Sequence, residues 1–171
     1  MSFGRLLFLF GIAAVCTAGL RFFIFEGIYI ASPSMEPTLP VGRHLFLDKT
    51  TFLFRDPRRG EVIAFVEPVP PHTEMVKRVI AIPGDEIEIR MKVVYINGEP
   101  IGESYVQHTR ADERLRGDNL GPLKVPQDAV FVLGDNRDES NDSSMWRDPD
   151  TGKRAPFVPF ERIRGRLRGV Y

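Results

Sequence analysis

MVKRVIAIPGDEIEIRMKVVYINGEPI, residues 75–101, contains the patterns that decide the fold. Met75–Ile82 is rich in β-branched residues, and Glu86–Met91 alternates polar and apolar side chains as a half-buried strand does. Val93–Ile101 carries Asn-Gly between two strand-like halves, and this dipeptide is typical of a two-residue hairpin turn. The stretch therefore predicts a succession of short strands joined by tight turns.

The same pattern continues on both sides of this stretch. Glu61–Val66 and Ala129–Leu133 are short, apolar and β-branched, and no segment after the N-terminal region keeps a helical period. We therefore predict a mostly β domain over residues 28–171, a coiled, barrel-like sheet structure with a small hairpin excursion around residues 91–126. Glu103–Gly121 is polar and is interpreted as a solvated loop.

The C-terminus alternates arginine with smaller or apolar residues over residues 162–169. This alternation predicts a strand whose arginine face is solvated and blocks pairing at a sheet edge. Contact of the arginines with anionic lipid is the alternative interpretation.

An uncharged apolar run opens the chain. Leu6–Leu20 has no charged residue, and Phe22–Phe25 continues the run after Arg21. This length is sufficient to span a hydrocarbon core of about 30 Å, so residues 1–27 are predicted to be a retained transmembrane helix. The alternative is a cleaved secretory signal, which lacks a convincing small-residue cleavage site before Gly19.

Composition narrows the classes of ligand. The 23 basic and 23 acidic residues cancel, which removes any global electrostatic reason to bind nucleic acid. The single Cys16 can form neither an internal disulfide nor a zinc site without further ligands. Residues 134–144 are rich in Asp and Asn but lack the spacing of a calcium loop. We expect no metal and no cofactor, and nothing in the composition indicates an oligomeric state.

IASPSMEPTL, residues 30–39, follows the apolar run and contains Ser34, a candidate nucleophile that needs a base. The three histidines have no local partner that marks a triad member: His44, His72 and His108. Lys77 and Arg78 lie on opposite faces of the predicted strand, and both faces are apolar, so alternation does not say which side chain points inward. Only the ammonium can usefully lose a proton, so Lys77 is the candidate base.

Four segments in order resemble the bacterial type I signal peptidases, which are membrane-bound serine endopeptidases with a serine–lysine dyad. The segments are SPSMEPTL (32–39), RGEVIAF (59–65), KRVIAIPGD (77–85) and GDNRDESNDS (134–143). The resemblance implies that Ser34 is the nucleophile and Lys77 the general base. It further implies that Ser32 helps to bind the oxyanion together with the Ser34 N–H, and that Ser140 orients the lysine amine. The same comparison implies supporting roles for Met35, Asp138 and Asp142.

Two positions depart from the family pattern. Pro33 stands where many relatives have glycine, and Ser144 replaces the arginine that usually pairs with Asp142. Arg147 or Arg137 could replace that arginine. If neither does, we expect Asp142 to be solvated and its loop to be looser than usual.

The resemblance implies an enzyme of the inner membrane, single-pass, with its catalytic domain on the extracytoplasmic side. Its partners would be the signal peptides of exported preproteins and membrane lipid, and its reaction would be the removal of those signal peptides. Two alternatives remain open: a specialised conjugation-type paralogue, and a catalytically inactive domain that binds envelope peptides.

Overall fold

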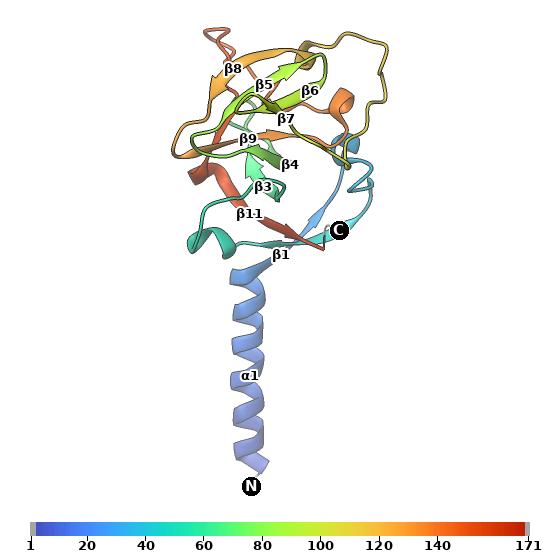
Figure 1. Ribbon diagram of the computed structural model, residues 1–171. Coiled ribbons are helices and arrows are strands. Elements are labelled where there is room, and N and C mark those ends of the chain that lie inside the picture. The colour runs from blue at the N-terminus through green and yellow to red at the C-terminus, as the bar shows by residue number, and fades with distance from the viewer. Residues whose placement is uncertain (1–2, 170–171) are drawn as a thin grey trace.

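The computed structural model describes residues 3–169, without the side chains of residues 18 and 20–23. Helix α1 (Phe3–Ile24) opens the chain and stands away from a β-rich domain (Figure 1). Within residues 3–169, no helix combines the length and the apolar character needed to cross a membrane. The structure therefore does not show the transmembrane helix predicted for residues 1–27.

Residues 25–27, which the sequence assigns to the anchor, belong instead to a strand. β1 (Phe25–Tyr29) follows α1 directly and pairs antiparallel with β2 (His44–Asp48), with Phe25 opposite Asp48. The apolar composition of Phe22–Phe25 hides this boundary, because an apolar strand and the end of an apolar helix have the same local signature.

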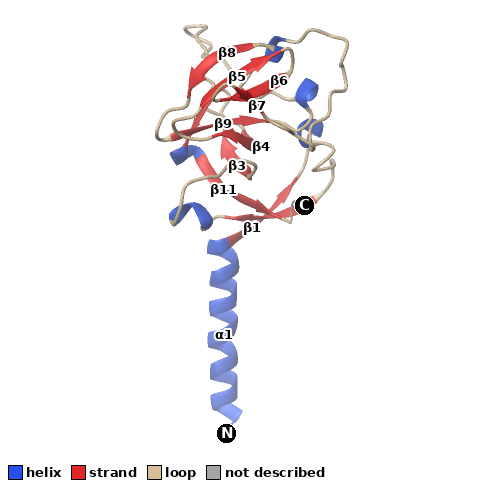
Figure 2. Cartoon of the chain, viewed as in Figure 1, coloured by secondary structure: helices blue, strands red, loops and turns tan. Residues whose placement is uncertain are grey.

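The larger sheet has seven strands in the order β1-β2-β11-β3-β4-β9-β10, and all its neighbours pair antiparallel. Its remaining strands are β3 (Val62–Val66), β4 (Glu74–Ala81), β9 (Ala129–Leu133), β10 (Phe157–Pro159) and β11 (Ile163–Arg168). The mostly β class predicted from the sequence is thus confirmed (Figure 2).

A second sheet of four strands, in the order β7-β6-β5-β8, lies at the end of the domain far from α1 (Figure 1). Its strands are β5 (Glu86–Arg90), β6 (Val93–Ile96), β7 (Glu99–Pro100) and β8 (Leu120–Lys124). The Asn-Gly turn forms as predicted, since Asn97 has φ 54° and Gly98 has φ 85°. The hairpin excursion predicted for residues 91–126 contains β6, β7 and β8 of this sheet, and β5 lies just before the excursion.

Short 3₁₀ turns connect the strands: η1 (Pro33–Met35), η2 (Thr51–Leu53), η3 (Arg116–Asp118), η4 (Arg137–Glu139) and η5 (Phe160–Arg162). A core cluster joins the two sheets, because Ile80 and Phe131 of the larger sheet pack with Ile87 and Val94 of the smaller one. β4 and β9 therefore form the part of the larger sheet that packs against the smaller one.

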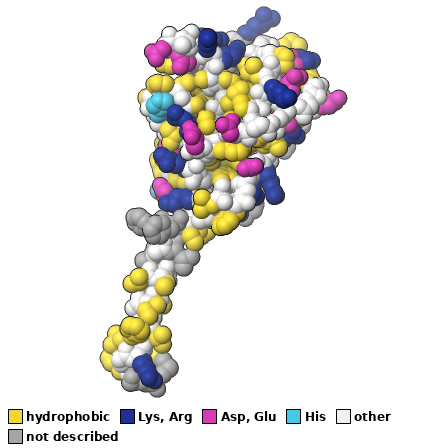
Figure 3. Space-filling view, turned by 90° about the vertical axis from the view of Figure 1, so that its left-hand side faces the viewer, with side chains coloured by type: hydrophobic (Ala, Val, Ile, Leu, Met, Phe, Trp, Pro, Cys, Tyr) yellow, Lys and Arg dark blue, Asp and Glu magenta, His cyan; other side chains and the backbone are white. Residues whose placement is uncertain are grey.

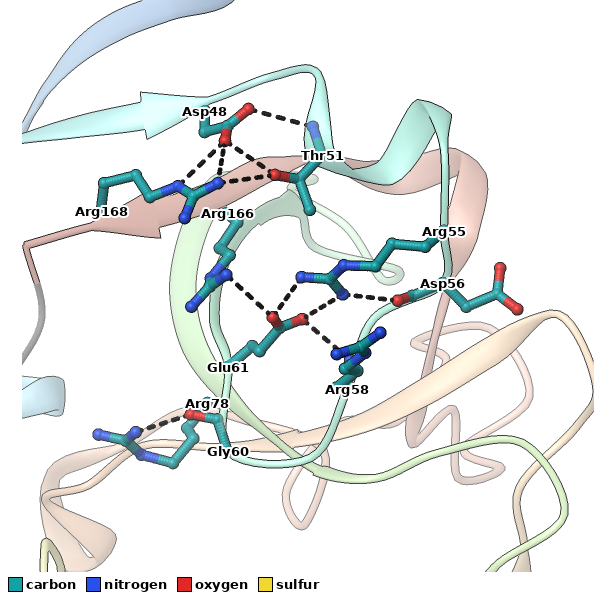
Figure 4. Close-up of polar contacts among 10 residues, drawn as sticks. All are labelled: Asp48, Thr51, Arg55, Asp56, Arg58, Gly60, Glu61, Arg78, Arg166 and Arg168. Carbon is teal, nitrogen blue, oxygen red and sulfur yellow. Dashed lines mark hydrogen bonds and ion pairs between the residues drawn. The ribbon is translucent and has the colours of Figure 1, made fainter.

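The C-terminal arginine strand corrects one prediction. β11 is not an edge strand, because it pairs with β2 on one side and with β3 on the other. Its arginines pair with carboxylates of neighbouring segments: Arg168 lies 2.6 Å from Asp48 and Arg166 lies 3.3 Å from Glu61, which also accepts Arg55 (Figure 4). The arginine face of the strand stays accessible to solvent, since Arg164 and Arg168 are exposed and Arg166 is half-buried.

The glycine in this strand has a packing role that we expect to be measurable. A Cβ at Gly165 would meet the Asp48 carbonyl carbon and Leu47 Cγ at 3.0 Å each. Gly165→Ala is therefore expected to lower the free energy of unfolding by about 1–3 kcal/mol, as overpacking typically does. Gly121→Ala is the matched control, because a Cβ there meets no atom within 4 Å. Urea denaturation in detergent measures both variants, and equal midpoints for the two would contradict this account.

Candidate active site

Ser34 lies in the 3₁₀ turn η1, which is fixed by backbone hydrogen bonds and by the buried side chain of the next residue, Met35. Met35 is buried in a core cluster with Leu39 and Leu47, and its carbonyl accepts the Leu39 N–H at 2.8 Å. Pro33 starts the turn, and its carbonyl accepts the Glu36 N–H at 3.0 Å. A proline at the first position suits such a turn, because its φ is already near the helical value.

Strand β4 brings Lys77 to this serine. The Lys77 Nζ lies 2.6 Å from Ser34 Oγ, although 43 residues separate the two in the chain. Both are buried, with 3% of Lys77 and 6% of Ser34 exposed to solvent. Ser32 Oγ lies 3.1 Å from Ser34 Oγ on the other side. Three of the residues that the family resemblance singles out therefore meet at one point.

The charge state of Lys77 reflects two opposing effects. Burial disfavours the ammonium and lowers the pKa of Lys77, while the negative charges of Asp142, Asp135 and Glu67 raise it. Burial is the larger effect, so the pKa lies below its ordinary value. An amine that is neutral in this position can accept the proton of the Ser34 hydroxyl.

The loop after β9, residues 134–144, closes over η1. Asn136 donates its backbone N–H to Ser34 O at 3.1 Å and its Nδ2 to Pro33 O at 3.2 Å. A Cβ at Gly134 would collide with Ser34 O and with the Ser140 side chain. Our sequence reasoning assigned no role to Asn136 or Gly134, although both lie in the GDN start of a segment that carries the resemblance.

Asp142 corrects the expectation of a solvated carboxylate and a looser loop. It is 1% exposed, and it accepts the Gly134 N–H at 3.0 Å and the Ser144 hydroxyl at 2.8 Å. No arginine forms an ion pair with it among residues 3–169: Arg137 pairs with Glu103, and Arg147 donates to Gly152 O. Ser144, the residue that departs from the family pattern, itself supplies the replacement hydrogen bond.

Asp138 fastens the same loop to the second sheet. Its carboxylate accepts the Lys92 ammonium at 2.9 Å and the Arg110 N–H at 2.7 Å, and His108 Nδ1 lies 3.4 Å away. Burial raises the pKa of Asp138, but the hydrogen bonds from Arg110 and Lys92 outweigh burial and hold it below its ordinary value.

The neighbouring basic residue has a different environment from Lys77. Arg78 is 8% exposed and forms two bonds with Asp135, at 2.8 and 2.5 Å. Its guanidinium also lies 4.0 Å from the centre of the Tyr105 ring, and Thr38 donates to the same aspartate at 2.5 Å. Sequence reasoning missed this pair, because the two partners lie 57 residues apart.

Ser140 lies beside the dyad without the hydrogen bond that the family resemblance implies. Its Oγ is buried and has no hydrogen-bond partner among residues 3–169. The Lys77 amine is directed at Ser34 instead. The orienting role of Ser140 therefore stays a prediction.

An open groove of about 300 Å³ leads to the dyad. One wall is residues 29–32, and the other is the start of β4 with the residue before it, residues 73–77. β4 pairs with β9 only from Arg78 onward, so its first residues have a partner strand on the β3 side alone.

Within residues 3–169, no group of three or more His, Cys, Asp or Glu could hold a metal ion.

Comparison with known proteins agrees with this geometry. The chain matches the family described as signal peptidase, peptidase S26, over residues 3–171. A probable signal peptidase I-2 of Synechocystis sp. is 38% identical over 159 residues, which cover 90% of this chain and 66% of that protein. Signal peptidase I P of Bacillus subtilis subsp. natto is 38% identical over 163 residues, which cover 90% of this chain and 87% of that protein.

A solved structure resembles the fold as well. The crystal structure of a signal peptidase I from Enterococcus faecalis V583 at 2.27 Å resolution is 28% identical, with a TM-score of 0.50. The match covers 67% of this chain and 98% of that one. The chain therefore belongs to the signal peptidase family, peptidase S26, as its four sequence segments predict.

Proposed function

We propose that this protein is a membrane-attached serine endopeptidase that removes signal peptides from exported preproteins. The observation that carries the proposal is the buried Lys77 amine, 2.6 Å from Ser34 Oγ at the end of an open groove. Membership of the signal peptidase family supports the substrate class. The arginine missing at Ser144 is the one sequence feature that favours a catalytically inactive binding domain, and the hydrogen bonds that hold buried Asp142 without that arginine count against this alternative.

In the first step, neutral Lys77 accepts the proton of Ser34 while Ser34 Oγ bonds to the carbonyl carbon of the scissile peptide. The tetrahedral intermediate then collapses, and the C–N bond breaks. The leaving amine of the mature protein takes the proton back from the Lys77 ammonium. The signal peptide remains as an ester on Ser34. A water gives a proton to Lys77 as its oxygen bonds to the ester carbonyl carbon, the bond from that carbon to Ser34 Oγ breaks, and Ser34 Oγ takes the proton back from the Lys77 ammonium.

The oxyanion of the intermediate needs two donors close to Ser34. The Ser32 hydroxyl lies 3.1 Å from Ser34 Oγ, and the Ser34 N–H has no acceptor among residues 3–169. We assign these two groups to the oxyanion. Removal of one such donor typically costs about 3 kcal/mol of transition-state stabilisation.

The groove suits an extended substrate. Residues 74–77 of β4 have no strand partner on their groove side among the described residues, so their backbone groups are available to a peptide. An extended peptide that pairs with a free strand edge gains main-chain hydrogen bonds independently of its sequence. This arrangement fits substrates whose sequences vary.

Membrane attachment is assigned to α1 and the adjoining end of the domain. The exposed side chains of α1 are largely apolar, and hydrophobic side chains line this stalk and the adjacent surface (Figure 3). The domain adds exposed apolar residues from β1, β2 and the η2 segment: Phe25, Phe46, Leu53 and Phe54. Large exposed apolar surfaces mark interaction sites, and we assign this one to lipid, with the domain on the extracytoplasmic side.

The dyad is tested by Ser34→Ala and Lys77→Ala. Each variant is expected to abolish cleavage of a test preprotein by the detergent-solubilised protein while its circular dichroism stays unchanged. The double variant should be hardly worse than either single one, because the two residues act as a unit. Ser104→Ala, at an exposed position, is the control and should cleave like wild type. Substantial turnover by Lys77→Ala at neutral pH would exclude lysine as the base.

Burial of Lys77 has a consequence for stability that Lys77→Met tests. The folded pKa lies below the unfolded value of about 10.4, so the unfolded lysine binds a proton that the folded one refuses. The resulting decrease in the free energy of unfolding is largest below the folded pKa, and it shrinks as pH rises toward the unfolded pKa. Lys77→Met is therefore expected to be inactive yet equally or more stable than wild type at neutral pH, with the difference shrinking in alkaline buffer.

Urea denaturation across pH measures this difference in unfolding free energy. Lys124→Met, at an exposed lysine in β8, is the matched control and should leave the pH dependence of stability unchanged. A Lys77→Met protein that is clearly less stable than wild type at neutral pH would show that the amine is not held in an apolar site.

Fractionation tests the membrane assignment. The full chain is expected to stay in the membrane pellet after alkaline carbonate washing, and added protease should degrade its domain in spheroplasts. A variant that lacks residues 1–24 keeps β1 intact and should leave the pellet while still needing detergent for solubility. If expression of the full chain instead gives a product that carbonate releases and whose N-terminus lies near Gly19, the leader is a cleaved signal.

A further inference from the structure

Glu67, directly after β3, is a buried carboxylate that the proposed mechanism does not use. It is 2% exposed, and its two oxygens accept hydrogen bonds from Asn141 Nδ2 at 3.1 Å and Thr73 Oγ1 at 3.0 Å. No basic side chain lies within ion-pair distance of its carboxylate among residues 3–169. A buried charge with only neutral partners is costly, and such groups are kept where they serve a function.

The two partners of Glu67 belong to the two parts of the site that must be aligned. Thr73 lines the groove just before β4, and its carbonyl also accepts the Glu67 N–H at 2.9 Å. Asn141 lies between Ser140 and Asp142 in the loop over η1. The carboxylate thus joins the wall of the groove to the loop that covers the dyad.

The charge of Glu67 also acts on Lys77. It raises the pKa of the amine, as do Asp142 and Asp135, against the larger lowering effect of burial. The basic residues next to Glu67 contact its backbone and not its carboxylate: His72 Nδ1 lies 3.0 Å and Arg162 Nη1 2.9 Å from the carbonyl oxygen. The carboxylate charge is therefore not neutralised locally.

We propose that Glu67 is a positioning residue of the peptidase reaction. Its carboxylate is hydrogen-bonded to Thr73 in the groove wall and to Asn141 in the 134–144 loop, and so holds these two segments together. Its negative charge favours the ammonium form of Lys77 over the neutral amine. This inference rests on the proposed endopeptidase function, so its test includes a measurement that does not require cleavage.

Two substitutions distinguish the effect of the hydrogen bonds of Glu67 from the effect of its charge. Glu67→Gln keeps the size of the side chain but removes the charge. Its Oε1 can still accept from Asn141 Nδ2, and its Nε2 can donate to the Thr73 hydroxyl, which reverses the direction of that bond. This variant should retain the wild-type KM, and the acid limb of its kcat/KM profile should move to lower pH, because the Lys77 amine loses its proton more readily. Glu67→Ala also removes the hydrogen bonds, and kcat/KM is expected to fall by about tenfold to a hundredfold with a raised KM. Glu99→Gln, an exposed carboxylate on β7, is the control and should change neither quantity.

Titration of the Lys77 amine by NMR of lysine-labelled protein gives the second measurement. Glu67→Gln should shift that titration to lower pH in the same direction as the rate profile. An unchanged amine titration and rate profile in folded Glu67→Gln would overturn the inference, as would a Glu67→Ala enzyme with wild-type KM and kcat. If the wild type cleaves no preprotein, the proposed function fails, and the amine titration still decides the role of Glu67.

Discussion

The base role proposed for Lys77 requires a neutral amine, and burial, which removes water from around it, lowers its pKa in that direction. Lys77 pairs with Ile63 of β3 and lies one residue before β4 begins to pair with β9, and only 3% of it is exposed to solvent. Burial of a cation is unfavourable, and the closely packed sheet is what sustains it. The position of Ser34 follows from the same constraint, since η1 must reach the one point where the amine faces the groove.

Nearby carboxylates limit how far burial lowers the pKa of the Lys77 amine. Asp142, Asp135 and Glu67 all favour the ammonium, and each is held by other groups. Asp135 is paired with Arg78, whereas Asp142 and Glu67 have neutral hydrogen-bond donors. Lys77 and Arg78 are thus adjacent in sequence but differ in chemistry: the lysine can be discharged, and the arginine remains a fixed charge that anchors the loop through Asp135.

The sequence correctly predicts the elements whose structure depends only on residues close to one another in the chain. The alternation in 86–91 and the Asn-Gly turn specify strands and a hairpin without any distant partner. β11 was recognised as a strand but misplaced in the sheet, because its neighbours β2 and β3 lie more than ninety residues earlier. Chemistry and family resemblance predict Ser34 and Lys77 as nucleophile and base, whereas the Arg78–Asp135 pair and the contacts of Glu67 depend on long-range packing that no local pattern encodes.

The direct junction between α1 and β1 sets the reach of the enzyme. The helix ends at Ile24, and only residues 25–33 separate it from Ser34, the proposed nucleophile. At about 3.3 Å per extended residue, the ten steps from Ile24 to Ser34 limit the height of Ser34 above the helix end to about 33 Å. Because β1 is hydrogen-bonded to β2, this connection is a stiff spacer and not a flexible tether. With the membrane attachment proposed for α1, the peptidase would select its scissile bonds by their height above the bilayer as well as by their sequence.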